Sequence, residues 1–179
     1  MKSRWRYIKT EKKYADRVLS VEHRHYHFDG AGASMPFTVV NIKNWVITVP
    51  VADSGKLVLV RQFRVGTDSV TYEFPGGAVD DGEVTADAAL RELAEETGYS
   101  SLSAKSLGIM HPNPAFMTNT CHCFLAENCV NGGSMNHDLF EETEPVEFTR
   151  EEVLKMVQTG GITHSITIAA IGLWLVDQG

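Results

Sequence analysis

The sequence predicts an α/β domain in which strands and helices are mixed along one chain. Residues 56–61 form a continuous apolar run of the length expected for a buried strand. Residues 85–97 place apolar side chains at helical spacing, and residues 165–178 form another, mostly apolar helical segment. Because no repeat, low-complexity tract or obvious linker separates these segments, we expect them to share one hydrophobic core.

The composition is that of a folded protein without a nucleic-acid-binding surface. Of its 179 residues, 43% are hydrophobic and 22% are charged, which is enough for one domain with a substantial core. The net charge of −7 opposes non-specific binding to phosphate backbones. Residues 1–6 lack the apolar stretch of a signal peptide, and the longest apolar run, residues 166–176, is too short to cross a bilayer. We therefore expect neither nucleic acid nor a membrane among the partners.

The cysteines indicate reduced thiols. Cys121, Cys123 and Cys129 are odd in number and lack the spacing of a disulfide framework, which favours a cytoplasmic protein. In a strand, Cys121 and Cys123 point to one face and His122 to the other, and this alternation explains the triplet better than a zinc site does. Three histidines share one face of a predicted strand: His23, His25 and His27. This face is either a transition-metal site or a solvated surface.

The first 45 residues are expected to form a β-rich extension, followed by a domain that spans residues 46–179. The clearest early strand is residues 46–49, and residues 53–55 predict a hairpin turn into the strand at 56–61. A further strand at residues 70–74 is ended by the Pro-Gly-Gly sequence that follows it.

The helix at residues 85–97 is amphipathic. Thr85 is a candidate N-cap, and Gly98 is a typical C-terminal stop. At about 100° per residue, Leu90, Leu93 and Thr97 lie on one side of the helix. The opposite side carries three carboxylates, those of Glu92, Glu95 and Glu96.

The elements after this helix are expected to be short. A strand at residues 121–125 leads into a loop at residues 128–136. Residues 145–148 predict another strand, and Thr149 with Glu152 forms a capping box for a helix that ends near Gly160. The last helix covers residues 165–178.

The three helical carboxylates predict metal chemistry on a phosphate compound. Acidic side chains clustered this closely repel one another unless a cation lies between them. Mg²⁺ takes oxygen ligands and is commonly shared with substrate phosphates, and a carbonyl of the Gly76–Gly77 turn is a natural additional ligand. Such an ion neutralises a pyrophosphate and lowers the pKa of a bound water. We expect Arg91 to pair with Glu95 or Glu83 rather than to act in catalysis.

The spacing of these residues resembles the signature of the Nudix hydrolases. The pattern is Gly, five residues, Glu, seven residues, then Arg-Glu-hydrophobe-any-Glu-Glu-any-Gly-hydrophobe. Tyr99 stands where an aliphatic residue is more usual, which affects packing rather than metal binding. The matching residues are Gly77, Glu83, Arg91, Glu92, Leu93, Glu95, Glu96, Gly98 and Tyr99.

The resemblance implies an α/β/α sandwich with a mixed sheet, preceded here by the β-rich extension. It also implies Mg²⁺- or Mn²⁺-dependent hydrolysis of a nucleoside diphosphate linked to another group. Glu95 then counts among the catalytic residues as well as the metal ligands. The implied ligands are Glu92, Glu95 and Glu96, with Glu83 and the carbonyl of Gly76.

Three further features resemble the ADP-ribose pyrophosphatase and nucleoside diphosphate sugar branch of that family. Pro114 lies fifteen residues after Tyr99, where it resembles a marker of that branch and a substrate contact. The N-terminal extension resembles a dimerisation segment, so a homodimer is expected, and residues 162–165 resemble the ending of those enzymes. The implied reaction splits ADP-ribose, or another nucleotide sugar, into a nucleoside monophosphate and a sugar phosphate.

Other readings of the family resemblance remain open. The substrate is alternatively another nucleotide, such as GDP-mannose, a dinucleoside polyphosphate or a nucleoside triphosphate. A different class of protein is a catalytically silent domain that senses a nucleotide sugar, although that reading calls for a broken acidic set.

The remaining candidate residues lie outside the helix. The resemblance places a general base on the acidic loop at residues 138–144, at Glu141 or else Glu142, unless this loop is merely solvated. Arg61 and Arg64 resemble arginines that meet phosphates or the terminal ribose, and the alternative is a surface charge pair.

For two further residues, the sequence does not decide between a role at the site and a structural role. Glu73 either contacts the substrate or faces solvent. His164 either covers the site or belongs to the end of the last helix.

Overall fold

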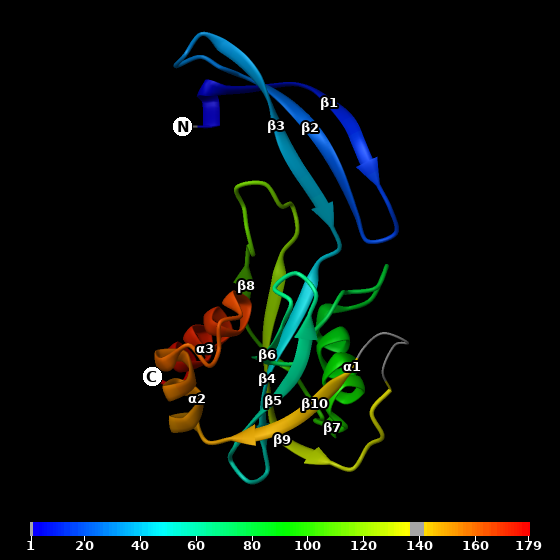
Figure 1. The fold of residues 1–179 in the computed structure, drawn as a ribbon, viewed down its shortest axis with the longest axis vertical. Helices are drawn as coiled ribbons and strands as arrows, with labels where there is room; N and C mark the ends of the chain where they lie inside the picture. The colour runs from blue at the N-terminus through cyan, green and yellow to red at the C-terminus, as the bar shows by residue number, and fades with distance from the viewer. Residues whose placement is uncertain (1, 137–141) are drawn as a thin grey trace. The chain divides into compact units, whose positions relative to one another are not determined.

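The computed structural model describes residues 2–136 and 142–179. The chain divides into two compact units, of which the first contains residues 1–43 and 111–120 and the second contains residues 44–110 and 121–179 (Figure 1). The second unit contains the helix at residues 85–97, which carries Glu92, Glu95 and Glu96 and is called the acidic helix below.

The first unit is built on a three-stranded antiparallel sheet in the order β1-β2-β3. A short 3₁₀ turn at Lys2–Arg4 precedes β1 (Trp5–Ala15), β2 (Leu19–Phe28) and β3 (Ala33–Ile42). The segment at residues 111–120 joins this unit through backbone hydrogen bonds of Val40 with Phe116 (2.7 Å) and Thr118 (3.1 Å). The role of this β-rich extension in dimerisation stays a prediction.

His25 and His27, two of the three histidines of β2, have carboxylate or hydroxyl neighbours. His25 Nε2 lies 3.4 Å from Glu11 Oε1, and His27 Nδ1 lies 2.9 Å from the Ser34 hydroxyl. In the described part of the chain, no group of three His, Cys, Asp or Glu residues is arranged to hold a metal ion.

The second unit contains a seven-stranded mixed sheet. Its strands run in the order β10-β5-β4-β9-β7, with β6 paired to β5 and β8 paired to β9. The β4–β9 pair is parallel and the other pairs are antiparallel. The strands are β4 (Trp45–Ala52), β5 (Leu57–Arg64), β6 (Ser69–Glu73), β7 (Tyr99–Ser100), β8 (Lys105–Met110), β9 (Cys121–Asn131) and β10 (Thr143–Phe148).

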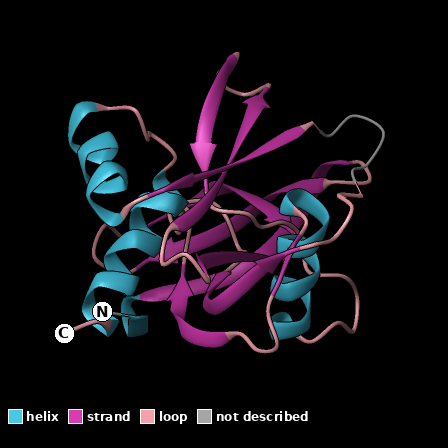
Figure 2. Ribbon diagram, turned by 90° about the horizontal axis from the view of Figure 1, so that it is seen from below, coloured by secondary structure: helices cyan, strands magenta, loops and turns pink. Residues whose placement is uncertain are grey.

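Helices cover both faces of this sheet, as the resemblance implied. Helix α1 (Thr85–Thr97) lies on one side, and α2 (Arg150–Thr159) and α3 (Ser165–Asp177) lie on the other (Figures 1 and 2). Alternation along β4 explains the arrangement, because Val46 packs with the α1 side and Ile47 packs with the α3 side. The predicted α/β/α sandwich is therefore confirmed.

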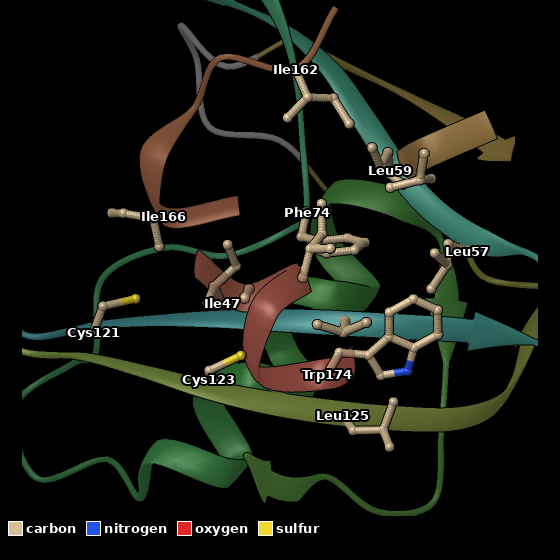
Figure 3. Packing of buried hydrophobic residues seen from close by; sticks show 14 residues of the cluster. Ile47, Leu57, Leu59, Phe74, Cys121, Cys123, Leu125, Ile162, Ile166 and Trp174 are labelled. Carbon is tan, nitrogen blue, oxygen red and sulfur yellow. The ribbon is translucent and has the colours of Figure 1, made fainter. Parts of the chain in front are cut away.

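The main core lies between the sheet and helices α2 and α3. Trp174 of α3 packs with aliphatic side chains of β4, β5 and β9 (Figure 3). Cys121 and Cys123 belong to this core as free thiols, and burial raises the pKa of each to about 12. A thiol with such a pKa stays protonated and unreactive at neutral pH.

Local sequence signals located most element ends. Gly55 and Gly98 both adopt the left-handed conformation at the predicted turn and helix end. The capping box of α2 is complete, since Thr149 and Glu152 exchange both hydrogen bonds. No described helix is long and apolar enough to span a membrane.

Two local predictions are wrong. Thr85 is the first residue of α1 rather than its N-cap, and the cap, Val84, makes no side-chain hydrogen bond. The loop expected from residue 128 begins later, because β9 continues to Asn131 and pairs there with Tyr99.

Candidate active site

Arg91 holds three of the carboxylates together. Its guanidinium makes two hydrogen bonds to Glu83 (2.8 and 2.9 Å) and one each to Glu92 and Glu95 (2.9 Å). The expected pairing of Arg91 is confirmed, and both of the alternative partners are used at once. The hydrogen bond to Glu83 raises the pKa of Arg91 well above its usual range, against the effect of burial and together with Glu92. The loop at Glu83 is thereby tied to α1.

Glu96 departs from the expected outward orientation. It is 2% exposed and lies close to the apolar side of α1, whereas the Glu92 and Glu95 side chains keep 13% and 35% of their surface exposed. Its Oε2 accepts a hydrogen bond from the backbone N–H of Gly76 at 2.9 Å. Glu96 therefore links the helix directly to the glycine turn.

The glycine turn runs along the edge of β4. The carbonyls of Pro75 and Gly77 accept hydrogen bonds from β4 backbone N–H groups, each at 2.9 Å. In an extended segment, carbonyls of successive residues point to opposite edges, so that of Gly76 points away from β4. The N–H of Gly76 points toward Glu96, and in extended backbone the carbonyl of the same residue points to the same edge. The role of the Gly76 carbonyl as a metal ligand stays a prediction.

Neighbouring atoms approach both glycines of the turn closely, backbone atoms at Gly76 and the flexible end of the Glu92 side chain at Gly77. A Cβ added to Gly76 would lie 2.2 Å from the backbone oxygen of Val46. A Cβ added to Gly77 would lie 2.5 Å from Glu92 Oε1. The turn thus packs against β4 on one side and against the acidic helix on the other.

The donor atoms gathered here suit a hard divalent cation. Carboxylate oxygens and a backbone carbonyl are the ligands that Mg²⁺ prefers. Glu92 and Glu95 are both hydrogen-bonded to Arg91, whose guanidinium supplies positive charge between them. The residue types present therefore fit the chemistry of such an ion, while in this structure Glu92 and Glu95 are held by Arg91 and no described group of three acidic side chains is arranged around one cation position.

A cavity of about 450 Å³ opens beside the glycine turn, within the size range of small-molecule sites. One part of its wall is apolar and includes Trp45, Phe74 and Ile166. The polar part comes from β5, β6, α1 and the start of α3, which are brought together only in the fold. The polar side chains that line it include Arg64, Thr67, Glu73, Glu96 and His164.

Glu73 is the centre of the polar wall. It is 1% exposed and receives two hydrogen bonds from Arg64 (2.9 and 2.8 Å), with further contacts from Thr71 and His164. Burial alone would raise the pKa of Glu73, but the hydrogen bonds from Arg64, His164 and Thr71 outweigh it and hold the pKa well below its usual range. Glu73 is therefore a buried carboxylate. The alternative in which its side chain faces solvent is wrong.

The other predicted substrate residues lie outside the cavity wall. Arg61 forms an exposed ion pair with Glu144 at 2.9 Å, which is the surface alternative considered for it. Pro114 is an exposed residue of the first compact unit. Of the candidate bases, Glu142 is exposed, and Glu141 lies outside the described residues.

Thr71 and Trp45 were not expected at this site, whereas His164, expected either at the site or at the end of the last helix, lies at both. Thr71 lies two positions before Glu73 in β6, and strand alternation could have placed both on one face. Trp45 begins β4 and His164 caps α3, but their approach to the cavity depends on tertiary packing. Tyr99 replaces the usual aliphatic residue and donates a hydrogen bond to Glu147 at 2.8 Å, which is a packing role.

Comparison with solved structures supports the fold. A crystal structure of an ADP compounds hydrolase matches with a TM-score of 0.85 over 98% of this chain and 96% of the other, at 23% identity. The likeness at this identity concerns the fold.

Sequence relatives extend the comparison. The ADP-ribose pyrophosphatase of Bacillus subtilis (strain 168) is 35% identical over 127 residues, which are 70% of this chain and 69% of the relative. The ADP compounds hydrolase NudE of Escherichia coli (strain K12) is 27% identical over 75% of this chain and 73% of the relative. The NUDIX domain family model matches residues 43–166. The chain therefore belongs to the Nudix hydrolase family.

Proposed function

We propose that this Nudix pyrophosphohydrolase is a Mg²⁺-dependent enzyme that hydrolyses nucleoside diphosphate sugars, with ADP-ribose as its favoured substrate. The products would be AMP and ribose 5-phosphate. The observation that carries the proposal is the Gly76–Glu96 contact, which brings the acidic helix and a backbone carbonyl to the rim of a cavity of suitable size. The 35% identical relative named for ADP-ribose supports the choice of substrate.

The metal would be held by oxygen atoms of α1 and the glycine turn. The proposed ligands are Glu92, Glu95, Glu96 and the Gly76 carbonyl, with Glu83 nearby through Arg91. When bound, a divalent ion supplies neutralisation of the pyrophosphate charge and a water of lowered pKa.

The protein's own residues would bind and orient the substrate. Arg64 lies in the cavity wall with its guanidinium oriented by the buried carboxylate of Glu73, and a guanidinium suits a phosphate group geometrically. The apolar wall at Trp45 and Phe74 excludes water from part of the cavity. Water activation by Glu141 or Glu142, a homodimer and a cytoplasmic location stay predictions.

Substitution of Glu96 by Gln tests the proposal. The amide oxygen of Gln can still accept the hydrogen bond from Gly76, so the fold should persist, while a charged metal ligand is lost. We expect kcat for ADP-ribose in Mg²⁺ to fall at least about 100-fold. Circular dichroism and thermal unfolding would establish that the variant is folded, and the exposed Glu151→Gln variant should retain wild-type turnover.

A substrate panel decides the finer assignment. ADP-ribose, GDP-mannose and a nucleoside triphosphate would be compared by kcat/KM in Mg²⁺ and after chelation, with ¹⁸O water to locate the bond that is broken. A higher kcat/KM for triphosphates would overturn the choice of substrate. Undiminished turnover by Glu96→Gln would overturn the metal assignment, and binding of ADP-ribose without release of AMP would indicate a silent domain.

A further inference from the structure

Glu73 and His164 form a carboxylate–imidazole pair at the wall of the cavity. His164 Nδ1 lies 2.9 Å from Glu73 Oε2 and 2.9 Å from the hydroxyl of Thr167. Glu73 is buried and is also bound by Arg64, so its position does not depend on solvent. The imidazole is thus anchored on one side by groups from two different elements.

The contacts of Nδ1 indicate that this ring nitrogen carries a hydrogen. The low pKa of Glu73 makes it a carboxylate, which can only accept hydrogen bonds, so Nδ1 is the donor. The Thr167 oxygen also accepts the backbone N–H of Phe74 at 3.1 Å and therefore belongs to the same fixed framework. The other ring nitrogen, Nε2, is left to interact elsewhere.

Nε2 is available at the cavity. Among residues 2–136 and 142–179, the imidazole of His164 makes hydrogen-bonding contacts through Nδ1 alone, and Nε2 is not sealed from solvent. His164 lines the cavity, and its side chain is 25% exposed. A buried carboxylate that fixes Nδ1–H is also the arrangement by which a histidine is oriented to act through Nε2.

Charged groups from three elements line the cavity around the imidazole. The titratable groups in the cavity wall are Arg64 from β5, Glu73 from β6, Glu96 from α1 and the protonated thiol of Cys121 from β9. Arg64 and Glu73 neutralise each other in a two-hydrogen-bond pair. An imidazole with hydrogen on both nitrogens adds a positive charge that offsets the remaining carboxylate, Glu96, and its Nε2–H can donate to an anion while Glu73 is its close counter-ion.

We propose that His164 is a substrate-binding residue whose Nε2–H donates a hydrogen bond to a phosphate oxygen of the nucleotide substrate, while Glu73 holds the ring through Nδ1–H. The proposal rests on the proposed function for the identity of the substrate. The hydrogen bond to the phosphate would come from the start of α3, because the carboxylates of the acidic helix can only accept hydrogen bonds.

The His164→Asn variant isolates the contribution of Nε2. The amide nitrogen of Asn can take the place of Nδ1 and keep the hydrogen bond to Glu73, but it offers nothing at the position of Nε2. His164 is the N-cap of α3 without a side-chain capping bond, and Asn is a favoured N-cap residue, so the helix should not be weakened. Thr163→Asn changes an exposed neighbour in the same loop and serves as the matched control.

The kinetic expectation follows from losing one charge-assisted hydrogen bond. The KM for ADP-ribose should rise about 10-fold or more in His164→Asn, while kcat changes less than about 2-fold. Thr163→Asn should keep both wild-type values. An unchanged KM in His164→Asn would overturn the proposal, because a purely structural partner of Glu73 is retained in that variant.

A spectroscopic test needs no turnover. In protein with ¹⁵N-labelled histidine, His164 is assigned by comparison with His164→Asn, and ribose 5-phosphate is then added to the wild type, with ribose as the uncharged control. We expect the Nε2 resonance to move toward that of a protonated nitrogen with ribose 5-phosphate alone. An equal response to ribose, or none to either, would overturn the proposal. Absence of hydrolysis by the wild type would instead count against the proposed function, and the ring-nitrogen response would still decide the role of His164.

Discussion

Replacement of Glu73 by Gln is the most informative perturbation of the cavity wall. Glu73 Oε1 accepts from Arg64 Nε and Thr71, and Oε2 accepts from Arg64 Nη2 and His164. Gln has the same shape but carries one amide NH₂ group. In either orientation of the amide, this group faces a nitrogen of Arg64 that is also a donor, so at least one hydrogen bond is lost and the negative charge disappears.

The expected cost can be bounded from the burial of the two partners. Removing one member of a fully buried ion pair costs about 3–5 kcal/mol, and a hydrogen bond to a charged group contributes about 1.5–3 kcal/mol. Glu73 is 1% exposed, but the Arg64 side chain is 45% exposed and can turn toward water, which lowers the cost. We therefore expect a loss of about 2–3 kcal/mol in the free energy of unfolding, or about 4–12 °C in Tm.

Urea unfolding followed by tryptophan fluorescence and by circular dichroism measures this loss. Glu127→Gln provides the control, because Glu127 is exposed and its substitution should change stability by less than about 0.5 kcal/mol. A loss for Glu73→Gln no larger than that of Glu127→Gln would refute the reasoning, since the pair with Arg64 would then contribute nothing measurable.

The same variant has a distinct pH dependence. Because the pKa of Glu73 in the folded protein is below its ordinary value of 4.5, its ionisation adds stability above that value, which is lost as the pH falls toward the folded pKa. The stability difference between wild type and Glu73→Gln should therefore be constant near neutral pH and shrink below the ordinary carboxyl pKa. A difference that grows in acid would contradict the assigned direction of the shift.

Two further substitutions test the turn and the capping box. Gly76→Ala should cost about 1–3 kcal/mol and impair turnover, because its Cβ would lie 2.2 Å from the Val46 oxygen, whereas Gly132→Ala meets nothing within 4 Å and should be near neutral in the same denaturation assay. Thr149→Ala should lower the free energy of unfolding by about 1 kcal/mol by removing the N-cap of α2, and an unchanged urea midpoint would contradict that role.

Local patterns predicted much of the fold. Apolar runs, alternation and turn residues located the strands around residues 46–64, and the capping box located the start of α2. Such signals succeed because strand alternation and capping depend on neighbours within a few residues. The burial of Glu96 could also have been predicted from the sequence. Its side chain lies about 60° from Leu93 around the helix axis, at the edge of the apolar side.

The sequence by itself determined the family, because the spacing from Gly77 to Tyr99 places the acids, Arg91 and the glycine turn within one continuous segment. Only the tertiary structure joined Arg64 and Glu73 to His164, which is 91 residues beyond Glu73 in the chain. Contacts over such separations depend on how α3 packs against the sheet, and no local pattern records that packing. One continuous segment is therefore enough to predict the reaction class, whereas the polar wall of the cavity forms only when the unit folds.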